Sequence, residues 1–428
     1  MKRYNYSDLS TEEVQKLVQR NVDPANEVRS VVEEIIAEVR QHGDSALVSY
    51  ALKFDKAELK KLYLNRAELE ILAAGVSSEQ RAAIETAYRN IYTFHKSQLE
   101  AERVIETMPG VTCWRELRAI EKVGLYVPGG SAVLPSTLLM LGVPAKIAGC
   151  HEIIVCSPPQ KDGKVNAFVA FVALLLGVDK IYLAGGAQAI AAMAYGTASI
   201  KKVDKIFGPG NQYVTKAKTI IQSTTTTAID MPAGPSEVLV VADESANPAF
   251  VAADLLAQAE HGTDSQAILV CISGKIADEV LMEIEKQTPV LPRAEIAKKA
   301  LENSYIIITK TLGQAMDFSN QYAPEHLILA TEHWKQLSGH IINAGSVFLG
   351  NLTPESAGDY ASGTNHTLPT SSYAKAYSGV SVDSFVKKIT FQHISPEGIK
   401  NIGPTVEILA ELEGLKAHKK AVTLRIIN

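Results

Sequence analysis

The chain has 428 residues and a formal net charge of −5, with 46% hydrophobic and 21% charged residues. A chain of this length exceeds the size at which a single hydrophobic core stops growing, so we expect two or more domains. The composition is that of an ordinary globular protein. The negative net charge argues against a nucleic-acid partner, because phosphate binding requires clustered Lys and Arg.

The sequence also argues against a membrane or an oxidising compartment. No apolar run reaches the roughly 18 residues of a membrane-spanning helix. The first residues, Met1-Lys-Arg-Tyr-Asn-Tyr-Ser, lack the apolar region of a secretory signal. The cysteines, at positions 113, 150, 156 and 271, form no CxxC pair. We therefore predict a cytoplasmic protein with reduced thiols.

The amino-terminal part of the chain is polar and helical in pattern. Residues 1–24 contain one short amphipathic stretch, Thr11-Glu-Glu-Val-Gln-Lys-Leu-Val. Residues 26–42 carry Val and Ile at helical spacing, and Gly43 follows as a stop signal. Helical texture continues over residues 79–104. The sequence thus predicts a small helical amino-terminal segment followed by further helices.

Further along, short β-rich runs alternate with helical stretches. The first set covers 123–127, 152–156, 180–184 and 205–207, with helices predicted at 167–176, 187–195 and 212–222. The second set covers 237–242, 267–272, 305–309, 327–330 and 346–349. Alternation of this kind predicts α/β domains with mostly parallel sheets.

We predict two α/β domains, the first of which interrupts the second. In this interpretation residues 25–125 and 236–380 form the main domain, residues 126–235 form the inserted domain, and residues 1–24 remain a separate segment. The tail, residues 381–428, is more polar, with helices expected at 405–412 and 415–424. Such a small tail has little core of its own and is expected to dock elsewhere, for instance on a partner subunit.

Two adjacent proton carriers, Glu325 and His326, directly follow Pro324. Proline fixes its own φ and favours an extended conformation at Ala323, so the pair is expected to leave a constrained turn. A His that titrates near neutral pH can remove a proton while a Glu activates a water molecule. The alternative is a solvated loop before the apolar run 327–330, and the dipeptide alone favours that alternative.

Side chains that could bind a metal or polar ligand occur at three further places. In chain order they are Gln258, His261, Asp359, His366, Glu413 and His418. The first two are three residues apart and project from one face in the last turn of a predicted helix. The next two lie in a segment of small and polar residues, a composition that often carries function. A Gln/His/Asp/His set suits zinc or a similar divalent ion, although each side chain alone is more often solvated.

Three glycine-rich turns follow predicted strands. They are Tyr126-Val-Pro-Gly-Gly-Ser131, Gly185-Gly-Ala-Gln188 and Phe207-Gly-Pro-Gly-Asn211. Such turns let backbone N–H groups approach a phosphate at the start of a helix. None of them matches GxGxxG, and each alone is ordinary turn chemistry. Three along one sheet edge predict a nucleotide or a similar ligand.

The cysteines are poor candidates for nucleophiles. Cys150, Cys156 and Cys271 lie in or beside apolar runs and are expected to be buried, inert thiols. Cys113 stands beside Trp114 and has no neighbouring His.

A set of short motifs along the chain matches a known family. The motifs are Gly124-Leu-Tyr-Val-Pro-Gly-Gly, Gly185-Gly-Ala-Gln-Ala-Ile-Ala, Lys205-Ile-Phe-Gly-Pro-Gly-Asn, Asp230-Met-Pro-Ala-Gly-Pro-Ser-Glu, Gln258-Ala-Glu-His-Gly, Ala323-Pro-Glu-His-Leu and Gly358-Asp-Tyr. In this order they resemble histidinol dehydrogenase, and the resemblance extends from the helical amino-terminal region to the tail.

The resemblance implies a fold and an activity. The fold is two incomplete Rossmann-like α/β domains with a small helical amino-terminal segment and a small tail domain, which agrees with the missing GxGxxG. The activity is zinc-dependent oxidation of L-histidinol to L-histidine through the aldehyde, with two NAD molecules as hydride acceptors, at the end of histidine biosynthesis. The resemblance also implies a homodimer whose tail reaches the other subunit's site, so that Glu413 and His418 would act in trans.

Single residues also receive roles by resemblance. His326 is similar to the general base that takes the hydroxyl proton, and Glu325 is similar to the group that activates water for attack on the aldehyde. The implied metal ligands, which lie at the substrate, are Gln258, His261, Asp359 and His418. Further implied substrate contacts are Ser236, His326, His366 and Glu413, and the implied NAD contacts are Tyr126, Gln188 and Asn211.

Two other classes of protein remain open at this stage. A metal-carrying binding protein could use the same His and Asp side chains without turnover, but it would not need Glu325 and His326 or the glycine-rich turns. A zinc hydrolase could use a Glu to activate water without any nicotinamide cofactor.

Overall fold

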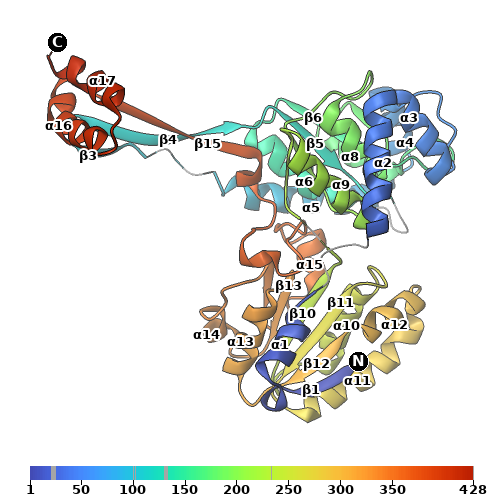
Figure 1. Cartoon of the computed structure of the whole chain (residues 1–428). Coiled ribbons are helices and arrows are strands. Elements are labelled where there is room, and N and C mark those ends of the chain that lie inside the picture. Colours follow the sequence, from blue (N-terminus) through green and yellow to red (C-terminus); the bar gives the residue numbers. More distant parts are fainter. Residues whose placement is uncertain (21–25, 100, 102, 130–133, 233, 428) are drawn as a thin grey trace.

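The chain folds into two six-stranded sheets covered by helices and a smaller three-stranded sheet that extends to one side (Figure 1). The structure is a computed structural model of residues 1–428, of which it describes all but residues 21–25, 100, 102, 130–133, 233 and 428. No helix in the described part of the chain is long and apolar enough to cross a membrane.

The first sheet has the strand order β2-β7-β6-β5-β8-β9. Its strands are β2 (Tyr63–Asn65), β5 (Lys122–Tyr126), β6 (Glu152–Ser157), β7 (Lys180–Leu183), β8 (Lys205–Phe207) and β9 (Ala228–Ile229). All neighbours are parallel except β2, which runs antiparallel to β7.

Helices cover the first sheet in two layers on each face. They are α2 (Asn26–His42), α3 (Asp44–Tyr50), α4 (Arg66–Ala73), α5 (Ser78–Lys96), α6 (Pro135–Ala148), α7 (Ala167–Leu175), α8 (Gly186–Tyr195) and α9 (Gln212–Thr224). Helix α2 packs on α8 and α9, α5 packs on α6, and α4 packs on α7. Because α6 and α8 lie between the sheet and an outer helix, they are apolar on nearly every side.

The second sheet is entirely parallel and has the order β1-β12-β11-β10-β13-β14. Its strands are β1 (Lys2–Asn5), β10 (Glu237–Ala242), β11 (Gln266–Cys271), β12 (Tyr305–Ile308), β13 (His326–Ala330) and β14 (Ser346–Leu349). Helices α10 (Pro248–Ala259), α11 (Gly274–Gln287) and α12 (Ala294–Glu302) pack on one face. Helices α1 (Thr11–Val18), α13 (Leu312–Tyr322) and α14 (Trp334–Ser338) pack on the other.

The two large sheets share one topology. In the first, the chain moves from β5 through β6 to β7 and then returns to β8 on the opposite side of β5. In the second, it moves from β10 through β11 to β12 and returns to β13 on the opposite side of β10. The strand order in each sheet therefore reverses at one point, and in open α/β sheets ligands usually bind there, at the carboxyl ends of the strands. This arrangement confirms the predicted fold class of two mostly parallel α/β sheets.

The tail contributes to a third, antiparallel sheet. Strands β3 (Ile105–Met108), β4 (Val111–Ala119) and β15 (Val386–Ile394) have the order β15-β4-β3. Helices α16 (Pro396–Leu412) and α17 (Lys416–Ile427) pack on each other, and α16 also contacts β3 and β4. In Figure 1 this unit projects away from both large sheets.

These pairings differ from the predicted domain boundaries. Residues 25–125 were expected to join residues 236–380, but β2 pairs with β7 and β5 pairs with β6, so both strands belong to the first sheet. The segment 1–24, expected to stand apart as a helical piece, adds β1 to the edge of the second sheet beside β12, while its last residues lie outside the described part. The tail contains β15 in addition to helices, and β15 pairs with β4 from the segment assigned to the main domain. Local periodicity carries no information about such long-range partners.

Candidate active site

Glu325 and His326 are buried at the start of β13, beside β10, where the strand order of the second sheet reverses. His326 is the first residue of β13 and lies opposite Val238 of β10. Glu325 is 6% exposed and His326 is 3% exposed, so the solvated-loop alternative is wrong. The turn before them is constrained, as predicted, but Ala323 adopts a left-handed conformation with φ 54° and not an extended one. Ala323 ends α13, and this conformation turns the chain directly from the helix into β13.

The backbone of Glu237, the first residue of β10, contacts both members of the pair. Its N–H donates to Oε2 of Glu325 at 2.9 Å. Its carbonyl oxygen accepts from Nδ1 of His326 at 3.2 Å. Since a carbonyl only accepts, Nδ1 carries a proton and Nε2 is the nitrogen left for chemistry. Among the described residues, Nε2 of His326 has no hydrogen-bond partner although it is buried.

Carboxyl groups surround His326. Its Nδ1 lies 3.7 Å from Oε2 of Glu325 and 3.6 Å from Oε1 of Glu355, and its Nε2 lies 3.4 Å from Oδ1 of Asp359. Glu355 and Asp359 are one turn apart on the short helix α15 (Glu355–Tyr360), so both face the same way.

This burial shifts the protonation of the pair. Burial lowers the pKa of His326, but Glu355, Glu325 and Asp359 outweigh it and raise that pKa well above its usual value. Burial raises the pKa of Glu325 to about 8, against the opposing effect of His326. A buried cluster with more carboxyl groups than cations is costly unless further positive charge is present.

The donor atoms of this cluster fit a divalent cation. Single ligand atoms of His326, Glu355 and Asp359 lie within 4.8 Å of one another. Mixed imidazole and carboxylate donors suit zinc and related ions. The unpartnered Nε2 of His326 and the excess of carboxyl groups both favour a cation here.

The predicted ligands Gln258 and His261 lie at the same cluster, at the end of α10. Gln258 is fully buried, and in the orientation that its neighbours require its amide donates to Glu355 and accepts from the Glu237 N–H at 3.1 Å. His261 is exposed in the single chain, yet desolvation by the atoms around it lowers its pKa, while Asp359 raises that pKa and His326 lowers it. The charges of Asp359 and His326 therefore act on His261. Two alternative sets of metal ligands therefore include Asp359. One adds His326 and Glu355, and the other adds Gln258 and His261.

The predicted substrate contacts Ser236 and His366 also adjoin this cluster. Ser236 immediately precedes Glu237 and is half-buried. Nδ1 of His366 donates to the backbone oxygen of Asp359 at 2.9 Å, and its Nε2 lies 3.4 Å from Oγ1 of Thr137. Thr137 belongs to α6 of the first-sheet unit, so His366 links the two large units at the site.

The structure does not bring Glu413 and His418 to this cluster within one chain. Glu413 caps the end of α16 and His418 lies in α17, and both are exposed. In Figure 1 these helices lie at the far end of the tail, away from β13 and α15.

The three residues predicted to contact a nucleotide gather at the carboxyl ends of first-sheet strands. Tyr126 ends β5, and its hydroxyl oxygen accepts from the N–H of Gly186 at 3.1 Å. Gln188 is buried in the first turn of α8. Asn211 caps α9 and accepts from the N–H groups of Tyr213 and Val214. The last residues of the turn that begins at Tyr126, from 130 onward, lie outside the described part.

A buried ion pair holds the third glycine-rich turn. Lys218 pairs with Asp230 and donates to the carbonyl of Gly208 at 2.9 Å, while Asp230 accepts from the Gly208 N–H at 2.8 Å. Gly208 has φ 132°, and an added Cβ would lie 2.2 Å from the carbonyl oxygen of Tyr126. Only glycine therefore allows β5 and this turn to approach so closely.

The cysteines behave as predicted. All are free thiols, and Cys150, Cys156 and Cys271 are buried. Burial raises the pKa of Cys150 and of Cys271 to about 11, which leaves little nucleophilic thiolate.

Comparisons with known proteins agree with this arrangement. The sequence profile of histidinol dehydrogenase matches residues 18–426. The chain belongs to the histidinol dehydrogenase family. Histidinol dehydrogenase of Bacteroides fragilis is 57% identical over 426 residues, covering 100% of this chain and 99% of that protein. The chloroplastic histidinol dehydrogenase of Arabidopsis thaliana is 52% identical over 428 residues, covering 100% of this chain and 91% of that protein.

A solved member of the histidinol dehydrogenase family has the same fold. The crystal structure of histidinol dehydrogenase from Elizabethkingia anophelis matches with a TM-score of 0.96 at 53% identity, covering 100% of this chain and 98% of that one. The family resemblance drawn from the motifs is thus confirmed.

The sequence did not point to three residues at or beside the cluster in this chain: Arg20, Glu237 and Glu355. A signal for Glu355 was present, since it stands four residues before Asp359 in a helix-compatible stretch. Glu237 was visible only as the last residue of a family motif. Arg20 offered no local signal, because its contacts with Glu237 and Tyr322 join residues more than 200 positions apart in the sequence.

Proposed function

We propose that the protein oxidises L-histidinol to L-histidine through the aldehyde, using zinc and two molecules of NAD. The observation that carries this proposal is the buried pair Glu325 and His326, held from opposite sides by the backbone of one residue. Family membership supplies the substrate, and the pair supplies two distinct proton-transfer groups for two successive oxidations.

His326 is the proposed general base. With its Nδ1 proton engaged by the Glu237 carbonyl, the Nε2 of a neutral His326 can take the hydroxyl proton as hydride leaves the carbinol carbon. The surrounding carboxyl groups raise the pKa of His326, and the charge of a bound zinc ion would oppose them and favour the neutral ring. After the first oxidation, Glu325 is proposed to take a proton from the water that adds to the aldehyde, while His326 returns its proton to the aldehyde oxygen. The neutral His326 then takes a proton of the hydrate as the second hydride leaves. One site thereby serves both half-reactions.

The proposed zinc ligands are Gln258, His261, Asp359 and, from the partner subunit's tail, His418. When bound, zinc would orient the imidazole and amino nitrogens of the substrate and add the positive charge that the carboxyl cluster lacks. His366 and Ser236 would line the same site, as would Glu413 of the partner subunit.

The NAD contacts are proposed at Tyr126, Gln188 and Asn211. They lie at the carboxyl ends of first-sheet strands, where helices α8 and α9 begin, and a helix start favours a phosphate. Asn211 caps two N–H groups of α9, whereas no side chain caps α8. NAD would accept one hydride in each half-reaction. The His366–Thr137 contact supports this geometry, because it joins the catalytic cluster to α6, the helix that follows β5.

A homodimer that exchanges tails is proposed from the exposed position of Glu413 and His418. Large apolar side chains on the tail also face solvent in the single chain: Ile408, Leu409, Leu412, Leu415, Leu424 and Ile427. A second copy would cover this surface and bring its His418 to the site. We propose the cytoplasm as its location.

Zinc-loaded protein given histidinol and NAD should form NADH, measured by its absorbance. A four-electron oxidation releases two hydrides, so two NADH per histidinol consumed are expected. Turnover without NADH would point to the hydrolase alternative, and zinc and histidinol binding without turnover would point to the binding-protein alternative.

The two catalytic residues should separate by half-reaction. His326→Gln is expected to slow both oxidations by about 10²–10⁴-fold, the usual contribution of a general base. Glu325→Gln should slow oxidation of the aldehyde far more than oxidation of the alcohol, because only the aldehyde step needs an activated water. Steady-state rates with histidinol and with histidinal measure this. Equal losses at both steps in Glu325→Gln would contradict the division of roles.

The two donor sets for the metal make different predictions for zinc binding. Free zinc at 100 times its dissociation constant should raise the free energy of unfolding by about 2.7 kcal/mol. Asp359→Asn should abolish most of this gain. We expect His261→Asn to weaken zinc binding by more than about 100-fold and Glu355→Gln by about 10–100-fold, the effect of removing a group that only supports the ligands. Zinc titration of each variant, followed by thermal unfolding, ranks the two. The reverse ranking would favour the set with His326 and Glu355.

Mixed dimers test whether His418 acts across subunits. Asp359→Ala and His418→Ala chains should each be inactive as homodimers. After they are co-expressed and mixed at random, half of the dimers are hybrid, and one of the two sites in each hybrid is intact. Activity of about a quarter of the wild-type value is therefore expected. No recovery in hybrids isolated with two different affinity tags would show that His418 acts within its own chain.

A further inference from the structure

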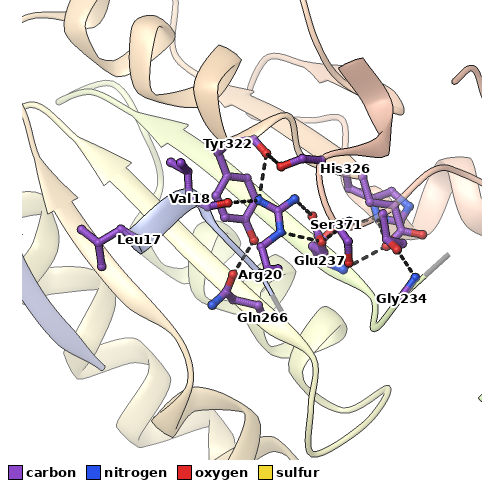
Figure 2. A network of polar contacts seen from close by, with 12 residues as sticks. Leu17, Val18, Arg20, Gly234, Glu237, Gln266, Tyr322, His326 and Ser371 are labelled. Atoms are coloured by element: carbon purple, nitrogen blue, oxygen red, sulfur yellow. Dashed lines mark hydrogen bonds and ion pairs between the residues drawn. The ribbon is translucent and has the colours of Figure 1, made fainter. Parts of the chain in front are cut away.

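A buried ion pair between Arg20 and Glu237 adjoins the catalytic pair, of which Figure 2 labels His326. Arg20 donates from Nε to Oε1 of Glu237 at 3.0 Å and from a terminal nitrogen to Oε2 at 2.7 Å. The Arg20 side chain is 11% exposed and that of Glu237 is 3% exposed. The N–H of Ser371 also donates to Oε1 of Glu237. Each carboxylate oxygen of Glu237 is thus bonded, and its position is fixed from two directions.

Arg20 also fixes the chain that leads into the pair. Its guanidinium stacks on the ring of Tyr322, 3.8 Å from the ring centroid, and donates to the Tyr322 carbonyl at 2.8 Å. The hydroxyl of Tyr322 donates to Oε1 of Gln266 at 2.6 Å. Figure 2 shows Arg20 between Tyr322 and Glu237, so one side chain connects the residue before the turn with the strand beside it.

We propose that Arg20 and Glu237 are positioning residues for the oxidation. Together they hold the residue 237 backbone and the 322–326 turn in the register that sets the Glu325 carboxylate and the His326 ring. This proposal rests on the proposed roles of Glu325 and His326.

The arrangement argues for orientation and not for stability alone. A buried ion pair is often no more stabilising than well-packed apolar side chains of the same size. Here, however, the carboxylate belongs to the residue whose N–H and C=O bond the two catalytic side chains. Strand pairing with β11 includes Glu237, opposite Gln266, but pairing with β13 begins only at Val238, opposite His326. On the side of the catalytic pair, the backbone of Glu237 is therefore held by contacts other than the ladder. The bidentate fork of Arg20 supplies a contact with defined direction.

Steady-state kinetics of Arg20→Met and Arg20→Lys test the proposal in the full-length, zinc-loaded enzyme. We expect Arg20→Met to lower kcat by about 100-fold, as a misplacement of about 1 Å does. Arg20→Lys keeps the charge but not the planar fork, so a loss of about tenfold is expected. The KM for NAD should stay unchanged in both, because the proposed NAD contacts belong to the other sheet. Arg20→Lys also serves if Arg20→Met fails to fold.

Arg81→Met provides a matched control. Arg81 is likewise partly buried, donates to the carbonyls of Ala73 and Val76, and lies 4.9 Å from the Phe171 ring centroid. It is far from the site, so kcat should stay within about twofold even where the thermal midpoint falls. Unchanged kcat in both Arg20 variants would overturn the proposal, and so would an equal loss of kcat in Arg81→Met.

The wild-type enzyme in the same assay separates this proposal from the proposed function. If the wild type fails to oxidise histidinol, the proposed function fails, and a crystal structure of Arg20→Met then decides the positioning role alone. The role predicts that the bond from the Glu237 N–H to Glu325, 2.9 Å in the native chain, is lost or lengthened. Retention of this bond and of the bond from His326 to the Glu237 carbonyl would reject it.

Discussion

The site depends on two hydrogen bonds made by the backbone of Glu237. Parallel pairing of β10 with β13 places the start of one strand beside the start of the other, so the amide of residue 237 meets Glu325 and its carbonyl meets His326. These bonds select the imidazole tautomer and orient the carboxyl group before any ligand arrives. Preorganisation of this kind lowers the cost of reaching the reactive geometry. The buried carboxylate of the same residue ties this geometry to Arg20, and so to the amino-terminal segment.

The candidate binding and catalytic residues lie at opposite strand ends in the two large sheets. In the first sheet, the glycine-rich turns follow β5, β7 and β8 at their carboxyl ends, as is usual for open α/β sheets. In the second, the proposed catalytic cluster lies at the amino ends of β10 and β13. Contact between His366 and Thr137 joins the two edges. Both edges are also held by buried ion pairs that bind backbone, Arg20 with Glu237 on one and Lys218 with Asp230 on the other. Similar topology thus serves two different tasks.

The acidic cluster around His326 bears on both the proposed metal and the proposed second subunit. Two buried carboxyl groups and the partly buried one of Asp359 surround one imidazole, and this arrangement is costly without a cation. The tail meanwhile exposes an imidazole, a carboxylate and a row of large apolar side chains far from the cluster. A bound divalent ion and a second subunit would satisfy both needs together. The same physical imbalance therefore motivates the proposed zinc and the proposed exchange of tails.

The sequence by itself determined the local elements and the chemical groups. Alternating β-rich and helical runs predicted the strands of both parallel sheets from residue 123 onward, except the two-residue strand β9. Helical spacing placed Gln258 and His261 close together, although α10 ends at Ala259 and His261 lies just beyond it. The adjacent pair Glu325 and His326 indicated proton transfer. Only the tertiary structure decided which strands pair and which distant side chains meet. Strand β2 has three residues, too few for a periodic signal, and its pairing with β7 placed this part of the chain in the first sheet and not in the second. Arg20 and Glu355 gained their roles only through packing. The reason is that periodicity and capping act within a few residues, whereas pairing of distant strands and burial of charges depend on the complementarity of surfaces that meet only in the folded chain.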